Sequence, residues 1–259
     1  MDQITVAVVE SALIAMSDEM SEALHRSAYS PIIREMLDYS CAVFDAAGHT
    51  VAQAENIPAL LGSMGIALGH LVAENPTASL RDGDIYIAND PYKGGTHTPD
   101  IHIFMPVFHA GQLIGWTGSL AHHADIGGTN PGTEGFANRS IFEEGLRFPN
   151  IRLFEAGVPC EPLHRYIEAN IREPAATLGD LRAQVAAVKL GAVRLRELAG
   201  RYGHDDLETA MAEILDQAER RVRSKIAARR DGTATAIGWL DNDGIGEDPV
   251  RIEAAVTVA

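Results

Sequence analysis

Two apolar segments, residues 101–108 and 112–120, flank the dipeptide Ala110-Gly111. Both segments are rich in β-branched and aromatic residues, which is typical of strands. The dipeptide supplies a Gly for positive φ, so the pattern predicts a β-hairpin with a short turn. This hairpin constrains the fold most, because it decides which distant polar residues come together at its open end.

The register of the hairpin follows from the turn by counting outward. With Ala110 and Gly111 as the two turn residues, Asp100 lies opposite Ala121 and Thr98 lies opposite His123. Residues that lie opposite each other, or two apart along a strand, share a face of the sheet. We therefore expect Asp100 and His123 to point the same way, with His97 close by.

The open end of this hairpin carries an unusual density of side chains that bind metals. Five of the ten histidines fall between Asn89 and Gly128, namely His97, His102, His109, His122 and His123. Imidazole and carboxylate are the ligands of catalytic divalent-metal sites. The sequence predicts such a site at His97, Asp100 and His123. A one-residue slip in register would present His122 instead of His123.

Other polar residues of this segment are weaker candidates for metal binding or catalysis. We expect His102, in the middle of a strand, to be structural, and His109, at the far turn, to lie outside the site. Asp125 suits a general base, a partner that orients an imidazole, or a turn cap. The Gly-rich loop at residues 127–135 has no nucleotide-binding signature, and its alternatives are an active-site loop or an ordinary surface loop.

Composition excludes several classes of protein. A net charge of -15 argues against nucleic acid or an anionic membrane as a partner. No apolar run approaches the roughly 20 residues of a membrane span. The two cysteines, Cys41 and Cys160, form no disulfide framework, which suits a reducing compartment and predicts a cytoplasmic protein.

The remaining pattern predicts an α+β protein. Apolar residues at helical spacing indicate an N-terminal helix at residues 4–28, with Val6, Val9, Leu13, Met16, Met20 and Leu24 on its buried face. The centre is mostly antiparallel β, with a second hairpin around Ala47-Gly48 and a short helix at 63–73.

The last hundred residues change from helix back to strand. Two long helices are expected at 175–202 and 205–229, broken near Gly203, followed by a β-hairpin from 233–240 and 250–258. We therefore divide the chain into three regions. They are an α+β metal-site region (1–160), a helical region (161–231) and a β-hairpin that begins a further β region (232–259).

Several long motifs resemble one known family. They are Asp38-Tyr-Ser-Cys-Ala-Val-Phe-Asp45 with the following Gly48 and Val51-Ala-Gln-Ala, Asn89-Asp90-Pro91, Gly94-Gly-Thr-His97 with Asp100, Ala121-His-His-Ala-Asp-Ile-Gly-Gly128 and Ile141-Phe-Glu-Glu-Gly-Leu-Arg147. Together they resemble the hydantoinase B/oxoprolinase family, including related subunits of caprolactamase and of acetone and acetophenone carboxylases. The resemblance covers the N-terminal half of such proteins, so the chain is expected to be that half.

The resemblance implies a metal-dependent subunit that works with an ATP-binding hydantoinase A-type partner in a hetero-oligomer. Members open cyclic amides such as hydantoins, oxoproline or lactams. The alternatives are a subunit of an ATP-dependent ketone carboxylase, or a non-catalytic scaffold subunit. ATP would bind the partner and not this chain, in keeping with the missing nucleotide motifs.

Carried over to this sequence, the family's metal ligands match His97, Asp100 and one of His122 or His123, with zinc or manganese as the expected ion. Asp38 matches a polar position of the early motif and is expected to reach the active site. With the amide oxygen phosphorylated by the partner, metal-activated water would attack, and Asp38 or Asp125 would take its proton.

One stretch departs from the family pattern. Two histidines that are frequent there are replaced by Asn56 and Leu60 in Asn56-Ile-Pro-Ala-Leu60-Leu-Gly-Ser-Met64. If those histidines shape the substrate pocket in the family, this chain is expected to take an unusual substrate.

Overall fold

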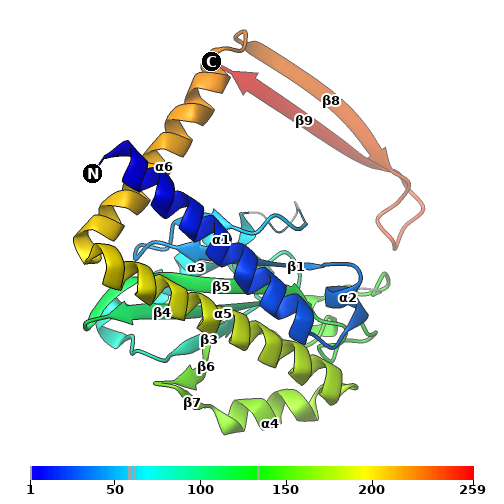
Figure 1. Cartoon of the computed structure of the whole chain (residues 1–259). Coiled ribbons are helices and arrows are strands. Elements are labelled where there is room, and N and C mark those ends of the chain that lie inside the picture. Colours follow the sequence, from blue (N-terminus) through cyan, green and yellow to red (C-terminus); the bar gives the residue numbers. More distant parts are fainter. Residues whose placement is uncertain (1, 58–59, 61, 133–134) are drawn as a thin grey trace.

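The fold is built on one seven-stranded antiparallel sheet, seen in a computed structural model that describes residues 2–57, 60, 62–132 and 135–259 (Figure 1). Along the sheet the strands are β2 (Thr50–Gln53), β1 (Tyr39–Phe44), β5 (Gln112–His122), β4 (Asp100–His109), β3 (Ile85–Ala88), β6 (Ile151–Glu155) and β7 (Val158–Pro159). Every neighbouring pair is antiparallel.

The predicted hairpin forms the middle of this sheet. Strands β4 and β5 pair from His109 and Gln112 at the turn to Asp100 and His122 at the open end. Ala110 and Gly111 both have positive φ, +49° and +82°. Positive φ at both central residues is the geometry that matches the twist of paired strands. The hairpin prediction is confirmed.

Two long helices cover one face of the sheet (Figure 1). They are α1 (Gln3–Ser27) and α5 (Pro174–Tyr202), which pack against each other and against the central strands. All six apolar α1 positions that the sequence placed on its inner face are buried, which confirms that prediction: Val6, Val9, Leu13, Met16, Met20 and Leu24. The main core lies between these helices and the sheet.

The opposite face of the sheet carries a smaller core. Helix α3 (Ser63–Glu74) packs there against aromatic side chains of the central strands, among them Phe104 and Trp116. Asp100 and His122 belong to this face, because they lie two residues from positions in this cluster or opposite them. Asp100 and His122 therefore lie on the face of the sheet that α3 covers.

Short helices complete the body of the protein. They are α2 (Pro31–Arg34), α4 (Glu161–Ala169) and the 3₁₀ turns Thr77–Ser79, Pro91–Lys93 and Ile141–Glu143. Helix α6 (His204–Ala227) follows α5 after Gly203, whose φ of +87° breaks the helix where the sequence predicted. Among the described residues, no helix has both the length and the apolar character that a membrane span requires.

The chain closes with a separate two-stranded hairpin, β8 (Gly232–Leu240) and β9 (Val250–Val258), which projects away from the sheet beyond α6 (Figure 1). Nearly all its residues are exposed. The element order of N-terminal helix, antiparallel sheet, long helices and hairpin confirms the α+β fold class. The division at residues 160 and 231 stays a prediction.

Candidate metal centre

Asp100 lies directly opposite His122 at the open end of the central hairpin. The register counted from the turn alone, with Asp100 opposite Ala121, is wrong by one residue. The pairing follows the predicted count at His109 and Phe108 but shifts between Phe108 and Val107. The structure thus joins His122 to Asp100, which is the alternative that a one-residue slip predicted.

A β-bulge causes this shift. Phe108 pairs with Leu113 and Val107 pairs with Gly115, so Ile114 is the extra residue on β5. Gly115 has φ +153°, and a Cβ atom there would lie 2.4 Å from the carbonyl oxygen of Phe44. The close approach of β1 therefore requires glycine beside the bulge.

His97, Asp100 and His122 form a compact cluster. One possible ligand atom from each residue lies within 4.8 Å of those of the other two. Nε2 of His97 is 3.1 Å from Oδ1 of Asp100, and the rings of His97 and His122 are 5.0 Å apart between centroids. The hydroxyl of Thr96 donates a hydrogen bond to Oδ2 of Asp100, which fixes the carboxylate.

The cluster lies at the boundary between core and solvent. Asp100 is 2% exposed and His122 is 7% exposed, whereas the side chain of His97 is 36% exposed. Burial lowers the pKa of His122 below its usual value. Burial acts in the same direction on His97, but the neighbouring Asp100 and Asp38 carboxylates outweigh it and raise the pKa of His97.

The charge of Asp100 is stabilised by its neighbours. Burial acts to raise the pKa of Asp100, yet the hydrogen bond and positive charge of His97 and the Thr96 hydroxyl lower it below its usual value. An ionised carboxylate with a neutral imidazole and a second, partly exposed imidazole is a ligand set suited to a divalent ion.

Asp38 stands beside this cluster. It immediately precedes β1, and its carbonyl oxygen accepts a hydrogen bond from the amide of His122 at 3.0 Å. Burial and the nearby Asp100 charge raise the pKa of Asp38, and the proximity of His97 opposes them. Asp38 thus interacts electrostatically with Asp100 and His97, and its role in an active site stays a prediction.

The donor set passes a simple fit test for a metal ion. Nδ1 of His122 is buried and has no hydrogen-bond partner among the described residues. The possible ligand atoms of His97, Asp100 and His122 lie within 4.8 Å of one another. Tetrahedral zinc with bonds of about 2.0–2.2 Å holds its ligand atoms about 3.3–3.6 Å apart, so side-chain rotations would have to bring the three atoms closer together around an ion.

His123, the ligand preferred from the sequence, lies elsewhere. It points toward α5, where its Nε2 is 2.9 Å from Oε1 of Gln184, and the Gln184 amide donates to the carbonyl oxygen of Ile101 at 2.8 Å. His123 is completely buried, and burial lowers its pKa. The expected grouping of His123 with Asp100 is therefore incorrect, since the bulge turns His123 to the other face.

Asp125 is engaged in a structural contact. Its Oδ1 is 2.7 Å from Nη1 of Arg172 and also accepts the amide hydrogen of Gly127 at 3.0 Å, and its Oδ2 accepts from the amide of Arg172. Asp125 is 3% exposed. These bonds connect the loop after β5 to the segment before α5. Asp125 therefore suits the role of a residue that anchors this loop better than the role of a general base.

The other residues singled out from the sequence lie outside the cluster. His102 is buried in the smaller core and stacks on Phe104, with ring centroids 5.7 Å apart. His109 lies at the far turn. Cys41 is a buried free thiol whose pKa is raised by burial, and Cys160 is a free thiol as well.

The two positions that depart from the family pattern have structural contacts. The side-chain amide of Asn56 donates to the carbonyl oxygen of Tyr39 at 3.0 Å and to the hydroxyl of Ser21. Leu60 is 3% exposed and packs in the smaller core. Residues 58, 59 and 61 of this stretch lie outside the described residues.

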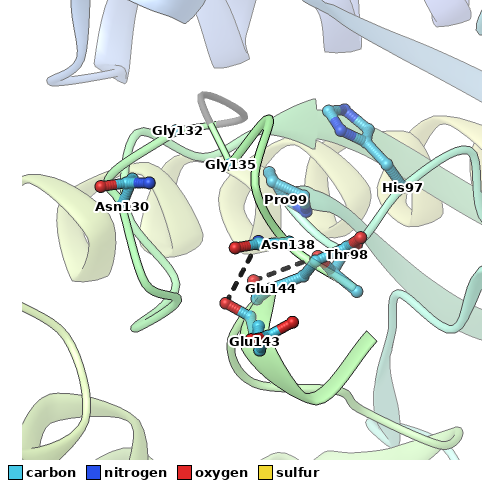
Figure 2. Close-up of a pocket in the computed structure, with 9 residues that line it drawn as sticks. All are labelled: His97, Thr98, Pro99, Asn130, Gly132, Gly135, Asn138, Glu143 and Glu144. Atoms are coloured by element: carbon cyan, nitrogen blue, oxygen red, sulfur yellow. Dashed lines mark hydrogen bonds between the residues drawn. The ribbon is translucent and has the colours of Figure 1, made fainter. Parts of the chain in front are cut away.

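A cavity opens beside His97 (Figure 2). Its wall includes His97 and Glu144, together with Gly132 and Gly135 of the Gly-rich loop. That loop thus borders the space beside the cluster, although its residues 133 and 134 are outside the described part. Thr96 and Glu144 were not predicted as site residues, and the only sequence signal for them was their position in the Gly94–His97 and Ile141–Arg147 motifs.

Relatives of known name resemble this chain over its full length. The B subunit of a putative D-/L-hydantoinase from Pseudomonas sp. is 34% identical over 263 residues, which cover 99% of this chain and 44% of that protein. The beta subunit of caprolactamase from Pseudomonas jessenii is 34% identical over 257 residues, with the same two coverages of 99% and 44%. The chain therefore spans less than half the length of these relatives.

Solved structures share the fold. The crystal structure of the ATP-dependent caprolactamase from Pseudomonas jessenii superposes with a TM-score of 0.91 at 32% identity, covering all of this chain and 45% of that one. Nucleotide-free acetone carboxylase superposes with a TM-score of 0.84 at 23% identity, covering 92% of this chain and 32% of that one. At this low identity, the similarity shows only that the two proteins share a fold. The family model described as Hydantoinase B/oxoprolinase matches residues 2–259, and the chain belongs to this family.

Proposed function

We propose that this chain is the metal-dependent part of an ATP-dependent enzyme that opens cyclic amides. The observation that carries the proposal is the cluster of His97, Asp100 and His122, whose possible ligand atoms lie within 4.8 Å of one another. Relatives named as hydantoinase, caprolactamase and 5-oxoprolinase proteins support amide substrates.

The three proposed ligands differ in burial and in hydrogen-bond partners, and we assign their roles accordingly. Asp100 supplies a charged oxygen that Thr96 and His97 hold in place, and His122 supplies a buried nitrogen. His97 is the most exposed of the three and borders the cavity, so it lies between the ion and the substrate space. A bound zinc or manganese ion would activate water and polarise the phosphorylated amide.

Asp38 is the best-placed group to handle the proton of that water. Its raised pKa, caused by burial and by the Asp100 charge, moves it toward the range useful for acid–base work. Asp125 is not proposed for this role, because Arg172 and two backbone amides occupy its carboxylate.

The activating step is assigned to a partner. Amides are poor electrophiles, and we propose that an ATP-binding hydantoinase A-type chain phosphorylates the amide oxygen before hydrolysis. The hydantoinase and caprolactamase relatives are each named as one subunit of a larger enzyme, which supports a hetero-oligomer. A ketone carboxylase would use the same ligands, so the requirement for bicarbonate separates that alternative from hydrolysis.

The first test is the metal content of the purified protein, measured by elemental analysis. We expect near-stoichiometric zinc or manganese in the wild type. The variants His97→Ala and His122→Ala should each lose most of it, whereas the control His109→Ala, at the far end of the same hairpin, should retain it. A metal-loaded preparation combined with the A-type partner and ATP should then consume a lactam or hydantoin without bicarbonate.

Two results would overturn the proposal. The absence of metal from the wild type, even after reconstitution with zinc and manganese, would favour the scaffold alternative. A strict requirement for bicarbonate with ketone substrates would instead favour the carboxylase.

A further inference from the structure

Glu144 faces the same space as His97 from a different part of the chain. Two cavities adjoin the cluster, one on the side of the Gly-rich loop and one on the side of Tyr92 and Arg139. His97, Asn138 and Glu144 are the residues that line both cavities. A group that borders both is well placed to contact whatever molecule reaches His97.

The backbone at Glu144 is held against the segment that follows His97 and against the loop after β5. The hydroxyl of Thr98, which is completely buried, donates to the Glu144 carbonyl oxygen at 3.2 Å. Gly145 pairs with Gly127 in a β-bridge, and a Cβ atom on Gly128 would lie 2.8 Å from the carbonyl carbon of Glu144. The position of Glu144 relative to the hairpin is therefore fixed by its backbone.

The carboxylate of Glu144 is nearly unoccupied, in contrast to that of its neighbour. Oε2 of Glu143 accepts the amide hydrogens of Arg139 and Ser140 at 2.6 and 2.9 Å in a capping box. Among the described residues, the Glu144 carboxylate accepts one long hydrogen bond, from the Thr98 hydroxyl at 3.4 Å (Figure 2). Its negative charge also contributes to the raised pKa of His97.

We propose that Glu144 determines substrate specificity by accepting the ring N–H of a neutral cyclic amide. This inference rests on the proposed function and names the part of the site that recognises the amide nitrogen of the substrate before its oxygen is phosphorylated, because the phosphorylated form is an imidate that no longer carries the N–H. In a small lactam the N–H and the C=O point to the same edge of the ring. A molecule with its carbonyl oxygen toward the His97 cluster would therefore present its N–H toward an acceptor on the adjacent wall.

A carboxylate suits this acceptor role. Hydrogen bonds to an ionised group are stronger than those between neutral groups. A site that hydrogen-bonds a substrate N–H discriminates against an analogue without it, because a polar group of the protein is then left without its partner. An N-methyl lactam should thus bind worse than the parent lactam.

The test compares the binding of 2-pyrrolidinone and N-methyl-2-pyrrolidinone to the metal-loaded full chain, measured by ligand-observed NMR titration. The wild type should bind the N–H compound about 10-fold more tightly or better, the effect expected of one hydrogen bond to a charged group. Glu144→Ala should abolish this preference and Glu144→Gln should reduce it. The control Glu143→Gln should keep it, and all variants should retain the wild-type metal content.

The outcomes separate this inference from the proposed function. Equal affinity of the wild type for the two lactams, binding of neither, or an unchanged preference in Glu144→Ala would overturn the role of Glu144. A wild type that prefers the N–H compound but hydrolyses no cyclic amide with ATP and the A-type partner would overturn the proposed function and leave the recognition role standing.

Discussion

Asp100 and His122 face each other across the central hairpin, and a single bulged residue decides that pairing. Without the bulge, the turn geometry would place Ala121 opposite Asp100. The bulge lies near the turn, far along the strands from the cluster, so the composition of the proposed metal site depends on backbone geometry at a distance.

Replacing Gly115 by Ala should disturb this geometry. The added Cβ would approach the carbonyl oxygen of Phe44 to 2.4 Å, so β1 or β5 must move. We expect a loss of about 1–3 kcal/mol in the free energy of unfolding, as for other overpacked sites. Urea denaturation would measure it.

The matched control for this change is Gly111→Ala at the hairpin turn. There a Cβ would meet no atom within 4 Å, so its cost is limited to the positive φ of +82°. We expect a smaller loss, about 1 kcal/mol. Equal stability of the Gly115→Ala variant and the wild type would show that the bulge tolerates a side chain.

Asp38→Asn should weaken the metal site without unfolding the protein. The substitution removes a carboxylate that is electrostatically coupled to His97 and Asp100 but preserves its size. Partners of this kind typically change metal affinity by about 10- to 100-fold. Competition with a chelator would measure the affinity, and Asp18→Asn, an exposed carboxylate on α1, should behave as the wild type.

Asp125→Asn should affect stability and leave the metal content unchanged. The variant weakens a nearly buried contact with Arg172, whose own side chain is 46% exposed. Loss of hydrogen bonds to a charged group is expected to cost about 1–3 kcal/mol. A thermal melt and elemental analysis of one sample would separate the effect on stability from the effect on metal content. Loss of the metal with unchanged stability would show that Asp125 contributes to the metal site.

His102 should make the stability of the protein sensitive to acid. Burial lowers the pKa of His102 from 6.5 to about 4. Between these values the unfolded chain binds a proton that the folded protein does not, so stability falls as the pH is lowered from 6.5 to 4. The contribution is at most about 3 kcal/mol, because one pKa unit corresponds to about 1.4 kcal/mol.

The variant His102→Leu removes this titration and should flatten the dependence of unfolding free energy on pH over that range. Urea denaturation at pH 4, 5, 6 and 7 would measure the slope. The control His109→Leu should keep the wild-type slope, and an unchanged slope in His102→Leu would mean that other groups cause the acid sensitivity.

Elements with strong local signals were predictable from the sequence. The spacing of Val9, Leu13, Met20 and Leu24 predicted α1, Gly203 predicted the break before α6, and Ala110-Gly111 predicted the central turn. The helix depends on the periodicity of its side chains, and the break and the turn each depend on the φ of one or two residues. These are local properties of the sequence, so they can be predicted without knowledge of tertiary contacts.

The ligand pairing was not predictable in the same way. The bulge at Ile114 depends on how closely β1 approaches Gly115, which is a contact between strands far apart in sequence. The contacts of His123 with Gln184 and of Asp125 with Arg172 likewise join segments separated by 61 and 47 residues. The sequence predicted the residue types of the candidate site, and tertiary packing determined which of them lie together.

The β8–β9 hairpin has a consequence for handling the protein. Alternation along the strands gathers Ala234, Ala236, Leu240, Val250, Ile252 and Val256 on one exposed face, while the other face mixes Ile237 and Trp239 with Thr233, Arg251 and Glu253. Exposed apolar faces of this kind and open strand edges favour self-association. We therefore expect light scattering to rise with concentration, and Val256→Lys to suppress that rise while leaving the melting of the seven-stranded sheet unchanged.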